Sequence, residues 1–392
     1  MKICLIIDLP GIGGASIAAN RTLDAVEQIT EPSMIASDFD QAEKTPSFCL
    51  QPGKKFKIFE LFASRMLPVS LYLKLRDLEL QRQLSKILNR IKPDIINFHN
   101  IHSAGWPIDL VANALKYAPV VWTLHDCWSF LGTYYPTHAP LPDERTLGKL
   151  KATWASLRKG KCHHSLSALT PSAWMQNQAS SSFWEGNLVK TIHNPIPESF
   201  FKDRDRKACK KALGLSQEKP VILCVAGNLD EERKGGRILK KILSSSLPDL
   251  AQFVLIGNGK GYENSDRTRI NCLGFVRDET TMQIAYHAAD LLLHPAPIDN
   301  LPNTVSESMS CGTPVVAFDT GGLPEMVIPE KSGWLVQEIN SESIARELDS
   351  IIKSRAYENL RESTRQTAFE LFHHKEIAQS YKNHFQLVKN QG

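Results

Sequence analysis

The regular alternation of short apolar runs with helical patterns is the feature that most constrains how this chain can fold. In the better runs, such as 221–226 and 315–318, apolarity is continuous instead of alternating. Strands of this kind are typical of parallel sheets that are buried on both faces. Strand and helix patterns alternating over such a length therefore predict a doubly wound α/β fold. The predicted strands are 3–7, 33–36, 95–98, 120–124, 167–169, 189–192, 221–226, 253–256, 270–273, 291–294, 315–318 and 334–336.

The length of 392 residues is too great for one ordinary core and predicts two domains. The strand series pauses at the two prolines of 194–197 and at the basic stretch 202–211, a composition typical of a linker. We therefore expect Rossmann-like domains at 1–197 and 198–375. Because ligands of such sheets bind at the carboxyl ends of the strands, two facing sheets would form one central cleft.

Composition and termini narrow the class of protein. The 46 basic residues exceed the 42 acidic ones by only +4, which argues against a nucleic-acid partner. The apolar N-terminal run lacks the longer apolar core and cleavage site of a signal peptide, and no stretch approaches the roughly 20 apolar residues of a membrane helix. Eight scattered cysteines indicate reduced core thiols. The sequence predicts a cytoplasmic protein.

Two carboxylates, Asp299 and Glu307, stand eight residues apart around a predicted helix start. Asp299 lies in a loop rich in proline and asparagine, and Pro302 suits a first helical turn. Asn303 and Thr304, which follow it, are candidate substrate-binding residues. Both carboxylates could point at one small, hydroxyl-rich ligand near the positive end of that helix. The alternative is a capped helix whose acids are merely solvated.

A glycine-rich loop with two cations follows strand 221–226. It contains Asn228, Arg233 and Lys234 and ends in Gly235 and Gly236 at a predicted helix start. Backbone amides and cations would both face an anion here, so the loop is a candidate diphosphate site. The same pattern also occurs in solvated turns.

The first strand is followed by a second glycine turn, with Gly13 and Gly14 before a helix. Glycine lets a phosphate or a sugar approach the backbone closely. Position 16 is serine, so the full dinucleotide fingerprint is absent.

Histidines and an acid follow two neighbouring strands in the first half of the chain. His125 and Asp126 come at the end of strand 120–124, while His99 and His102 end the preceding strand. We expect all four on one rim of the sheet, because carboxyl ends of parallel strands share an edge. A histidine at the end of a strand also commonly serves only to satisfy a local carbonyl.

Taken together, these segments resemble retaining glycosyltransferase family 4. The resemblance rests on the paired acids, the words Cys-Gly-Thr-Pro-Val-Val at 311–316 and Gly-Gly-Leu-Pro-Glu at 321–325, the Lys-Gly pair at 234–235 and several other loops, so it covers most of the chain. It implies the two-lobed GT-B fold, with the last helix, 376–392, crossing back onto the first lobe.

The resemblance also assigns roles. Lys234 would contact the donor diphosphate, Glu307 the ribose and Asp299 a hydroxyl of the donor sugar. The further implied contacts are Gly13 and Gly14 facing the donor phosphates, His125 beside the donor sugar, Asp126 contacting the acceptor or orienting a neighbour, and the loop with Val276 bordering the base. The family usually has glutamate at 299 and arginine at 228, so either Arg233 replaces that arginine or one cation fewer holds the diphosphate.

The function that follows is a retaining, metal-independent glycosyltransferase with no cofactor. It would move a sugar from a nucleoside-diphosphate sugar to a hydroxyl of a glycan or lipid-linked saccharide, in bacterial cell-surface polysaccharide synthesis. Alternatives are a nucleotide-sugar epimerase or phosphorylase and a non-catalytic binding protein. The cationic, apolar segment 54–76 could lie on the inner face of the membrane as a peripheral contact, or could pack as a helix on the first sheet.

Overall fold

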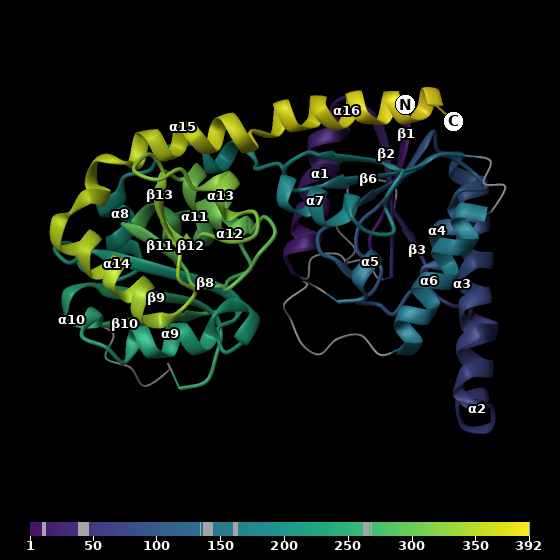
Figure 1. Cartoon of the computed structure of the whole chain (residues 1–392), viewed down its shortest axis with the longest axis horizontal. Helices are drawn as coiled ribbons and strands as arrows, with labels where there is room; N and C mark the ends of the chain where they lie inside the picture. Colours follow the sequence, from purple (N-terminus) through teal and green to yellow (C-terminus); the bar gives the residue numbers. More distant parts are fainter. Residues whose placement is uncertain are drawn as a thin grey trace. The chain divides into compact units, whose positions relative to one another are not determined.

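The computed structural model describes residues 1–9, 13–37, 47–133, 135, 144–159, 164–261, 266 and 269–391. The chain divides into two compact units (Figure 1). The first unit comprises Met1–Ile192 together with Lys375–Gly392, and the second comprises His193–His374. Each unit is built around one parallel sheet.

The sheet of the first unit has the strand order β3-β2-β1-β4-β5-β6-β7, with every neighbouring pair parallel. Its strands are β1 (Lys2–Ile6), β2 (Glu31–Ala36), β3 (Ser47–Cys49), β4 (Ile95–Phe98), β5 (Val120–Thr123), β6 (Leu166–Thr170) and β7 (Leu188–Thr191). β1, β4 and β5 are buried almost throughout, as continuous apolarity predicts. β3 was not predicted from the sequence, because it is a short edge strand with no buried residue.

Helices cover both faces of this sheet. They are α1 (Gly14–Glu27), α2 (Lys54–Met66), α3 (Val69–Ile91), α4 (Asp109–Ala114), α5 (Trp128–Leu131), α6 (Glu144–Lys159), α7 (Ala173–Ser180) and α16 (His374–Gln391). α16, at the C-terminal end of the chain, places Tyr381 and Phe385 in the same apolar cluster as Ile3 and Leu5 of β1. A segment nearly four hundred residues away in sequence thus completes the core around the first strand (Figure 1).

The sheet of the second unit has the order β10-β9-β8-β11-β12-β13 and is also parallel. Its strands are β8 (Val221–Asn228), β9 (Gln252–Asn258), β10 (Ile270–Gly274), β11 (Leu291–His294), β12 (Val315–Phe318) and β13 (Gly333–Val336). Its helices are α8 (Arg206–Ala212), α9 (Gly236–Leu243), α10 (Leu247–Leu250), α11 (Glu279–Ala288), α12 (Asn303–Ser310), α13 (Leu323–Met326), α14 (Ser341–Ser354) and α15 (Arg361–Phe372), with 3₁₀ turns at Glu198–Phe200, Glu232–Lys234 and Ala356–Asn359.

The second sheet separates two apolar clusters. Along β8, Val221 and Leu223 belong to one cluster, whereas Ile222 and Cys224 belong to the other. Since successive side chains of a strand point to opposite faces, both faces are buried. All twelve predicted strands are present, and the predicted doubly wound α/β class is confirmed.

Each sheet contains a point where the chain reverses its direction of winding. In the first sheet β1 and β4 are neighbours, and the chain runs from β1 to β2 on one side and from β4 to β5 on the other. In the second sheet β8 and β11 are neighbours, with β9 on one side and β12 on the other. Helices that diverge on the two sides leave a crevice outside the carboxyl ends of such strands, where ligands of open α/β sheets bind. The residues that follow β1, β4, β8 and β11 are therefore the first place to look for a site.

Candidate functional site

A buried charge cluster lies at the reversal point of the second sheet. Lys234 ends the loop after β8, and its Nζ lies 2.5 Å from Oδ2 of Asp299, which follows β11. Nε2 of His294, the last residue of β11, lies 3.5 Å from the same oxygen. Lys234 and Asp299 were predicted separately from the sequence, and the structure places them in direct contact, with His294, which was not predicted, against the same carboxylate.

Two glycines allow the loops around this cluster to approach each other. Gly235 has φ +81°, and a Cβ there would lie 2.1 Å from the carbonyl oxygen of Pro295. Gly321 has φ +61°, and a Cβ there would lie 2.0 Å from the carbonyl oxygen of Asp299. Both positions therefore need glycine, for the backbone angle and for the space. The glycine turns hold Lys234 and Asp299 in contact.

The carboxyl group of Asp299 is ionised although it is only 4% exposed. Burial alone would raise its pKa, but the ammonium group of Lys234 and the imidazole of His294 hold the pKa well below its ordinary value. Its second oxygen, Oδ1, accepts a hydrogen bond from the backbone amide of Asn300 at 3.0 Å. The site thus combines a fixed anion with an amine that remains partly exposed.

Glu307 lies in the second turn of α12, close to where the sequence placed it. It is buried, and its Oε2 accepts a hydrogen bond from the hydroxyl of Tyr286 on α11 at 2.6 Å. Pro302, which the sequence placed in the first turn, immediately precedes α12, and the first two residues of the helix are Asn303 and Thr304. Asn303 contacts Asn194, whose Nδ2 lies 3.3 Å from its Oδ1.

The remaining predicted residues of the second unit make contacts of their own. Arg233 donates from Nε to Oε1 of Glu231 at 2.9 Å, so its charge is already balanced locally. Asn228, at the exposed end of β8, accepts a hydrogen bond from the amide of Asp230. Val276 follows β10 and packs partly buried against the core.

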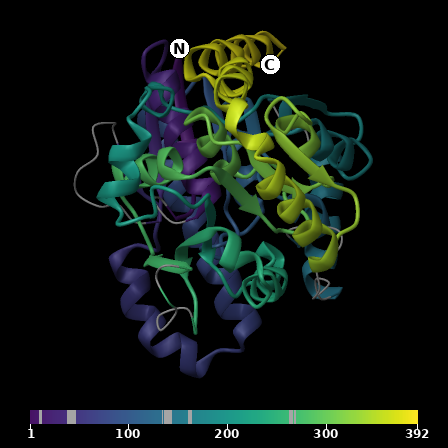
Figure 2. The ribbon, with the colours of Figure 1, turned by 90° about the vertical axis from the view of Figure 1, so that its left-hand side faces the viewer.

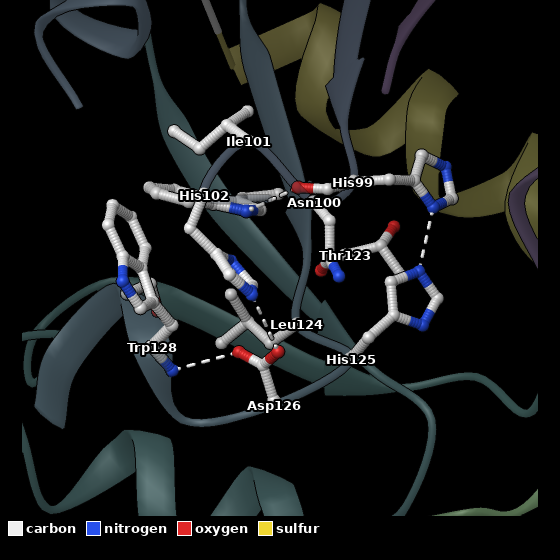
Figure 3. Close-up of a pocket in the computed structure, with 11 residues that line it drawn as sticks. His99, Asn100, Ile101, His102, Thr123, Leu124, His125, Asp126 and Trp128 are labelled. Carbon is white, nitrogen blue, oxygen red and sulfur yellow. Dashed lines mark hydrogen bonds and ion pairs between the residues drawn. The ribbon is translucent and has the colours of Figure 1, made fainter. Parts of the chain in front are cut away.

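A pocket lies at the corresponding edge of the first sheet (Figure 3). The rings of His99 and His125 stack at 5.2 Å, and Nδ1 of His99 lies 2.9 Å from Nε2 of His125. On the other side of His99, Nε2 lies 3.1 Å from Oδ1 of Asn97. The structure confirms that the histidines of β4 and β5 share one rim.

Asp126 and His102 occupy the other side of the same pocket. Nε2 of His102 lies 3.4 Å from Oδ2 of Asp126, while Oδ1 accepts a hydrogen bond from the backbone amide of Trp128 at 2.9 Å (Figure 3). The imidazole of His102 stacks on the indole of Trp128 at 5.1 Å. Asp126 thus contacts His102 with one carboxylate oxygen and the backbone of Trp128 with the other.

The loop after β1 also reaches this edge. Asp8 is buried, and its Oδ2 accepts hydrogen bonds from the amides of Ser103 and Ala104, at 2.6 and 3.1 Å. Gly13 has φ +85° and precedes α1, which begins at Gly14; both are exposed, and residues 10–12 of the predicted turn lie outside the described part of the chain. A Cβ at Gly13 would meet nothing within 4 Å among described residues, so the backbone angle is what favours glycine there.

Four residues of these clusters were not selected from the sequence: Asp8, Asn97, Tyr286 and His294. His294 stands at the end of an apolar strand, the same signal that identified His125. Asp8 follows the first strand in the same way. Tyr286 lies inside a helix, where nothing in the local sequence marks it.

Among the described residues, one group could supply three metal ligands: Glu198, His373 and His374. It lies where α15 ends and α16 begins. Nε2 of His373 is already 2.7 Å from Oε2 of Glu198, the distance of an ordinary hydrogen bond. This contact explains the pair without an ion.

Models of two glycosyltransferase families match the chain. The model "Glycosyltransferase Family 4" matches residues 48–200, and the model "Glycosyl transferases group 1" matches residues 219–354. Together they cover most of both units. The chain belongs to the GT4-type glycosyltransferases.

Solved structures share the fold over the whole chain. Sucrose-phosphate synthase of Thermosynechococcus elongatus has a TM-score of 0.76 at 19% identity and covers 100% of both chains. HepE of Anabaena, in complex with UDP and glucose, has a TM-score of 0.71 at 20% identity, over 98% of this chain and 99% of that one. The predicted GT-B fold class is confirmed.

Curated relatives match over part of their length. D-inositol 3-phosphate glycosyltransferase of Mycobacterium marinum is 27% identical over 179 residues, which are 43% of this chain and 38% of the relative. The sulfoquinovosyl transferase SQD2 of Arabidopsis thaliana is 26% identical over 75% of this chain and 57% of its own length. The chain spans about half the length of the curated relatives that it matches.

Proposed function

We propose that this chain is a retaining glycosyltransferase that transfers a sugar from a nucleoside-diphosphate sugar to a hydroxyl group. The observation that carries the proposal is the contact of Lys234 with Asp299 at the reversal point of the second sheet, in a chain of this family. A cation for the diphosphate and an acceptor for sugar hydroxyls meet where such a sheet binds ligands.

The donor diphosphate is the proposed ligand of Lys234. The ammonium group has three hydrogens, and the contact with Asp299 uses one of them. The others can reach phosphate oxygens, because the side chain keeps 24% of its surface exposed. Helices α9 and α12 both begin beside this cluster and present the positive ends of their dipoles. Arg233 then serves Glu231, so the diphosphate is held with one cation fewer than is usual in the family.

Two carboxylates and a loop that faces the nucleobase complete the proposed donor site. Glu307, held by Tyr286, is proposed to bind the ribose hydroxyls. Asp299 is proposed to accept from a hydroxyl of the donor sugar while it holds Lys234 in place. The amides of Asn303 and Thr304 are proposed to face the phosphate, and the loop around Val276 the base.

The proposed reaction keeps the configuration of the sugar. The bond from the anomeric carbon to the phosphate oxygen breaks, and its electron pair stays on that oxygen. The acceptor hydroxyl oxygen bonds to the same face of the anomeric carbon, and its proton passes to the departing phosphate oxygen. Lys234 and the helix ends stabilise the charge that gathers on the diphosphate. In this proposal, the transfer uses neither a metal ion nor another cofactor.

Residues of the first unit are proposed to contribute to transfer as well. His125 and Asp126 line the pocket at the reversal point of the first sheet. Gly13 and Gly14 lie at the start of α1, the helix that follows β1. We propose that His125 acts on the donor sugar, that Gly13 and Gly14 face the donor phosphates, and that Asp126 keeps its neighbours in place for the acceptor.

The acceptor is proposed to be a glycan or a lipid-linked saccharide in bacterial cell-surface polysaccharide synthesis. Helices α2 and α3 extend from the first unit as a pair (Figures 1 and 2). They expose the apolar side chains Ile58, Phe59, Met66, Val69, Leu71 and Leu78 beside the lysines Lys54, Lys57 and Lys74. Among the described residues of the two helices, the buried apolar ones are Leu80, Leu84 and Leu88, in the second half of α3.

We call these nine residues the α2–α3 surface and propose that it lies on an anionic membrane. A peripheral location on the cytoplasmic face of a membrane follows from that assignment. No helix within the described ranges is both long enough and apolar enough to span a bilayer.

Product analysis with a panel of nucleotide sugars tests the function. The purified protein is incubated with each donor and a mixture of short saccharides. The products are then separated by chromatography and identified by mass spectrometry. Release of nucleoside diphosphate with a new glycoside supports the proposal. Conversion of the sugar while still attached to the nucleotide would indicate an epimerase, and binding by calorimetry with no product would indicate the non-catalytic reading.

A further inference from the structure

The ring of His125 belongs to a chain of buried hydrogen bonds whose directions can be deduced. This series of hydrogen bonds begins at Asn97, whose Nδ2 lies 3.0 Å from the carbonyl oxygen of Val121 and 3.0 Å from Oγ1 of Thr123. A carbonyl oxygen can only accept, so the nitrogen of the amide must face it. Oδ1 of Asn97 is thereby the atom that faces His99.

His99 is fixed in turn. Oδ1 of Asn97 can only accept, so Nε2 of His99, 3.1 Å away, must carry a hydrogen. His99 is fully buried, and burial, reinforced by His125, holds its pKa well below the ordinary value, so its imidazole is neutral. A neutral imidazole that is protonated at Nε2 has a lone pair at Nδ1.

His125 is the last member of this series of hydrogen bonds. Its Nε2 lies 2.9 Å from Nδ1 of His99 (Figure 3). Since that Nδ1 has a lone pair and no hydrogen, Nε2 of His125 carries the hydrogen between them. Loss of solvent around the ring, with His102 as a smaller contribution, lowers the pKa of His125 to about 4. His125 is therefore neutral near pH 7, with its lone pair on Nδ1.

We propose that Asn97 and His99 are positioning residues that hold His125 in the neutral tautomer protonated at Nε2, so that Nδ1 can only accept a hydrogen bond and binds a sugar hydroxyl. The part concerning the hydroxyl rests on the proposed function. A diphosphate oxygen near pH 7 has no hydrogen to donate to Nδ1, so the diphosphate is excluded as its ligand. His125 distinguishes the neutral part of a nucleotide sugar from the charged part.

Nuclear magnetic resonance on protein with ¹⁵N-labelled histidine tests the tautomer directly. We expect His125, assigned by the loss of its signals in His125→Gln, to show a protonated Nε2 and a bare Nδ1 at pH 7. A scalar coupling across the hydrogen bond to Nδ1 of His99 is also expected. An imidazolium, or a hydrogen on Nδ1, would overturn the proposal. This readout does not depend on any transfer activity, so it stands or falls separately from the proposed function.

Two variants of His99 test the positioning role. In His99→Gln the amide can still donate to Asn97 and accept from His125, whereas His99→Phe offers neither group. With the donor identified by the panel, we expect His99→Phe to lower kcat roughly tenfold, as the loss of one hydrogen bond would, and to give mixed tautomers of His125. His99→Gln should retain both the tautomer and most of kcat. If His99→Phe keeps the Nε2-protonated tautomer and full kcat, His99 does not position His125.

Discussion

The ammonium group of Lys234 lies beside a buried carboxylate and is also the proposed ligand of the donor diphosphate. Lys234→Ala should remove a charge-assisted contact of about 1.5–3 kcal/mol, which is roughly 10- to 150-fold in kcat/KM. The same change should raise the pKa of Asp299, because the charge of Lys234 is the largest influence that lowers it. Steady-state kinetics, with circular dichroism to check folding, provides the measurement.

Lys241→Ala is the matched control, since this exposed lysine of α9 pairs with the exposed Glu342. It should leave kcat/KM unchanged. Near-normal turnover in a folded Lys234→Ala variant would remove Lys234 from the phosphate site.

At the scale of elements, glycine turns bring loops from distant parts of the sequence into contact. Gly321→Ala should distort the turn after β12, because the added Cβ would lie 2.0 Å from the carbonyl oxygen of Asp299 at a φ of +61°. Gly214→Ala has a similar φ, +64°, but its Cβ meets nothing within 4 Å among described residues. Gly214→Ala should therefore cost only the conformational strain, roughly 1–2 kcal/mol in the free energy of unfolding. Gly321→Ala should cost more and should also lower transfer.

Chemical denaturation and transfer assays of the two glycine variants provide the comparison. Equal losses of stability, with transfer unaffected in both, would show that the approach of Gly321 to Asp299 does not position the carboxylate.

The α2–α3 surface allows a second test at this scale. Ile58→Ser and Met66→Ser remove exposed apolar side chains, which are 62% and 81% exposed. Each should weaken sedimentation with vesicles containing anionic lipid, and high salt should weaken binding of the wild type because the lysines contribute. Leu250→Ser, an exposed leucine of the second unit, is the control and should not change binding. Binding that is absent in the wild type, or equal in all variants, would refute the membrane assignment.

Sequence patterns predicted the strands well because a strand buried on both faces leaves a continuous apolar signal, as in β4 and β11. They also placed His99 and His125 on one rim. The hydrogen bond between His99 and His125 depends on the register of β4 against β5, in which Phe98 pairs with Trp122. The sequence alone does not specify that register.

The partners of the acids could not be predicted for a related reason. Tyr286 reaches Glu307 from another helix, and His294 reaches Asp299 through the loop after β11. The first contact depends on the packing of α11 against α12, and the second on the conformation of the loop. The pairing of Arg233 with Glu231 depends likewise on the conformation of the loop after β8, which the sequence does not specify.

At the scale of the whole molecule, buried neutral histidines link stability to pH. Burial is the main cause that lowers the pKa of His125, His287 and His384 to about 4. Their unfolded value is near 6.5, so between these values the unfolded chain binds more protons and stability falls as the pH falls. Each should contribute roughly 1.4 kcal/mol per pH unit in that window.

Thermal unfolding measured from pH 7 to pH 4.5 checks this expectation. The midpoint should decrease steadily across this range, and His384→Gln should reduce the slope. A midpoint that is constant or rises on acidification would contradict the burial of neutral histidines.

The most direct measurement of the central claim is a proton magnetic resonance time course of the reaction with the donor found in the panel. Wild-type protein should release nucleoside diphosphate at the rate at which a new anomeric signal appears, with the same configuration as in the donor. Lys234→Ala should show both signals at a strongly reduced rate. A product of inverted configuration, or equal rates in wild type and variant, would contradict the account of retaining transfer at the Lys234 and Asp299 site.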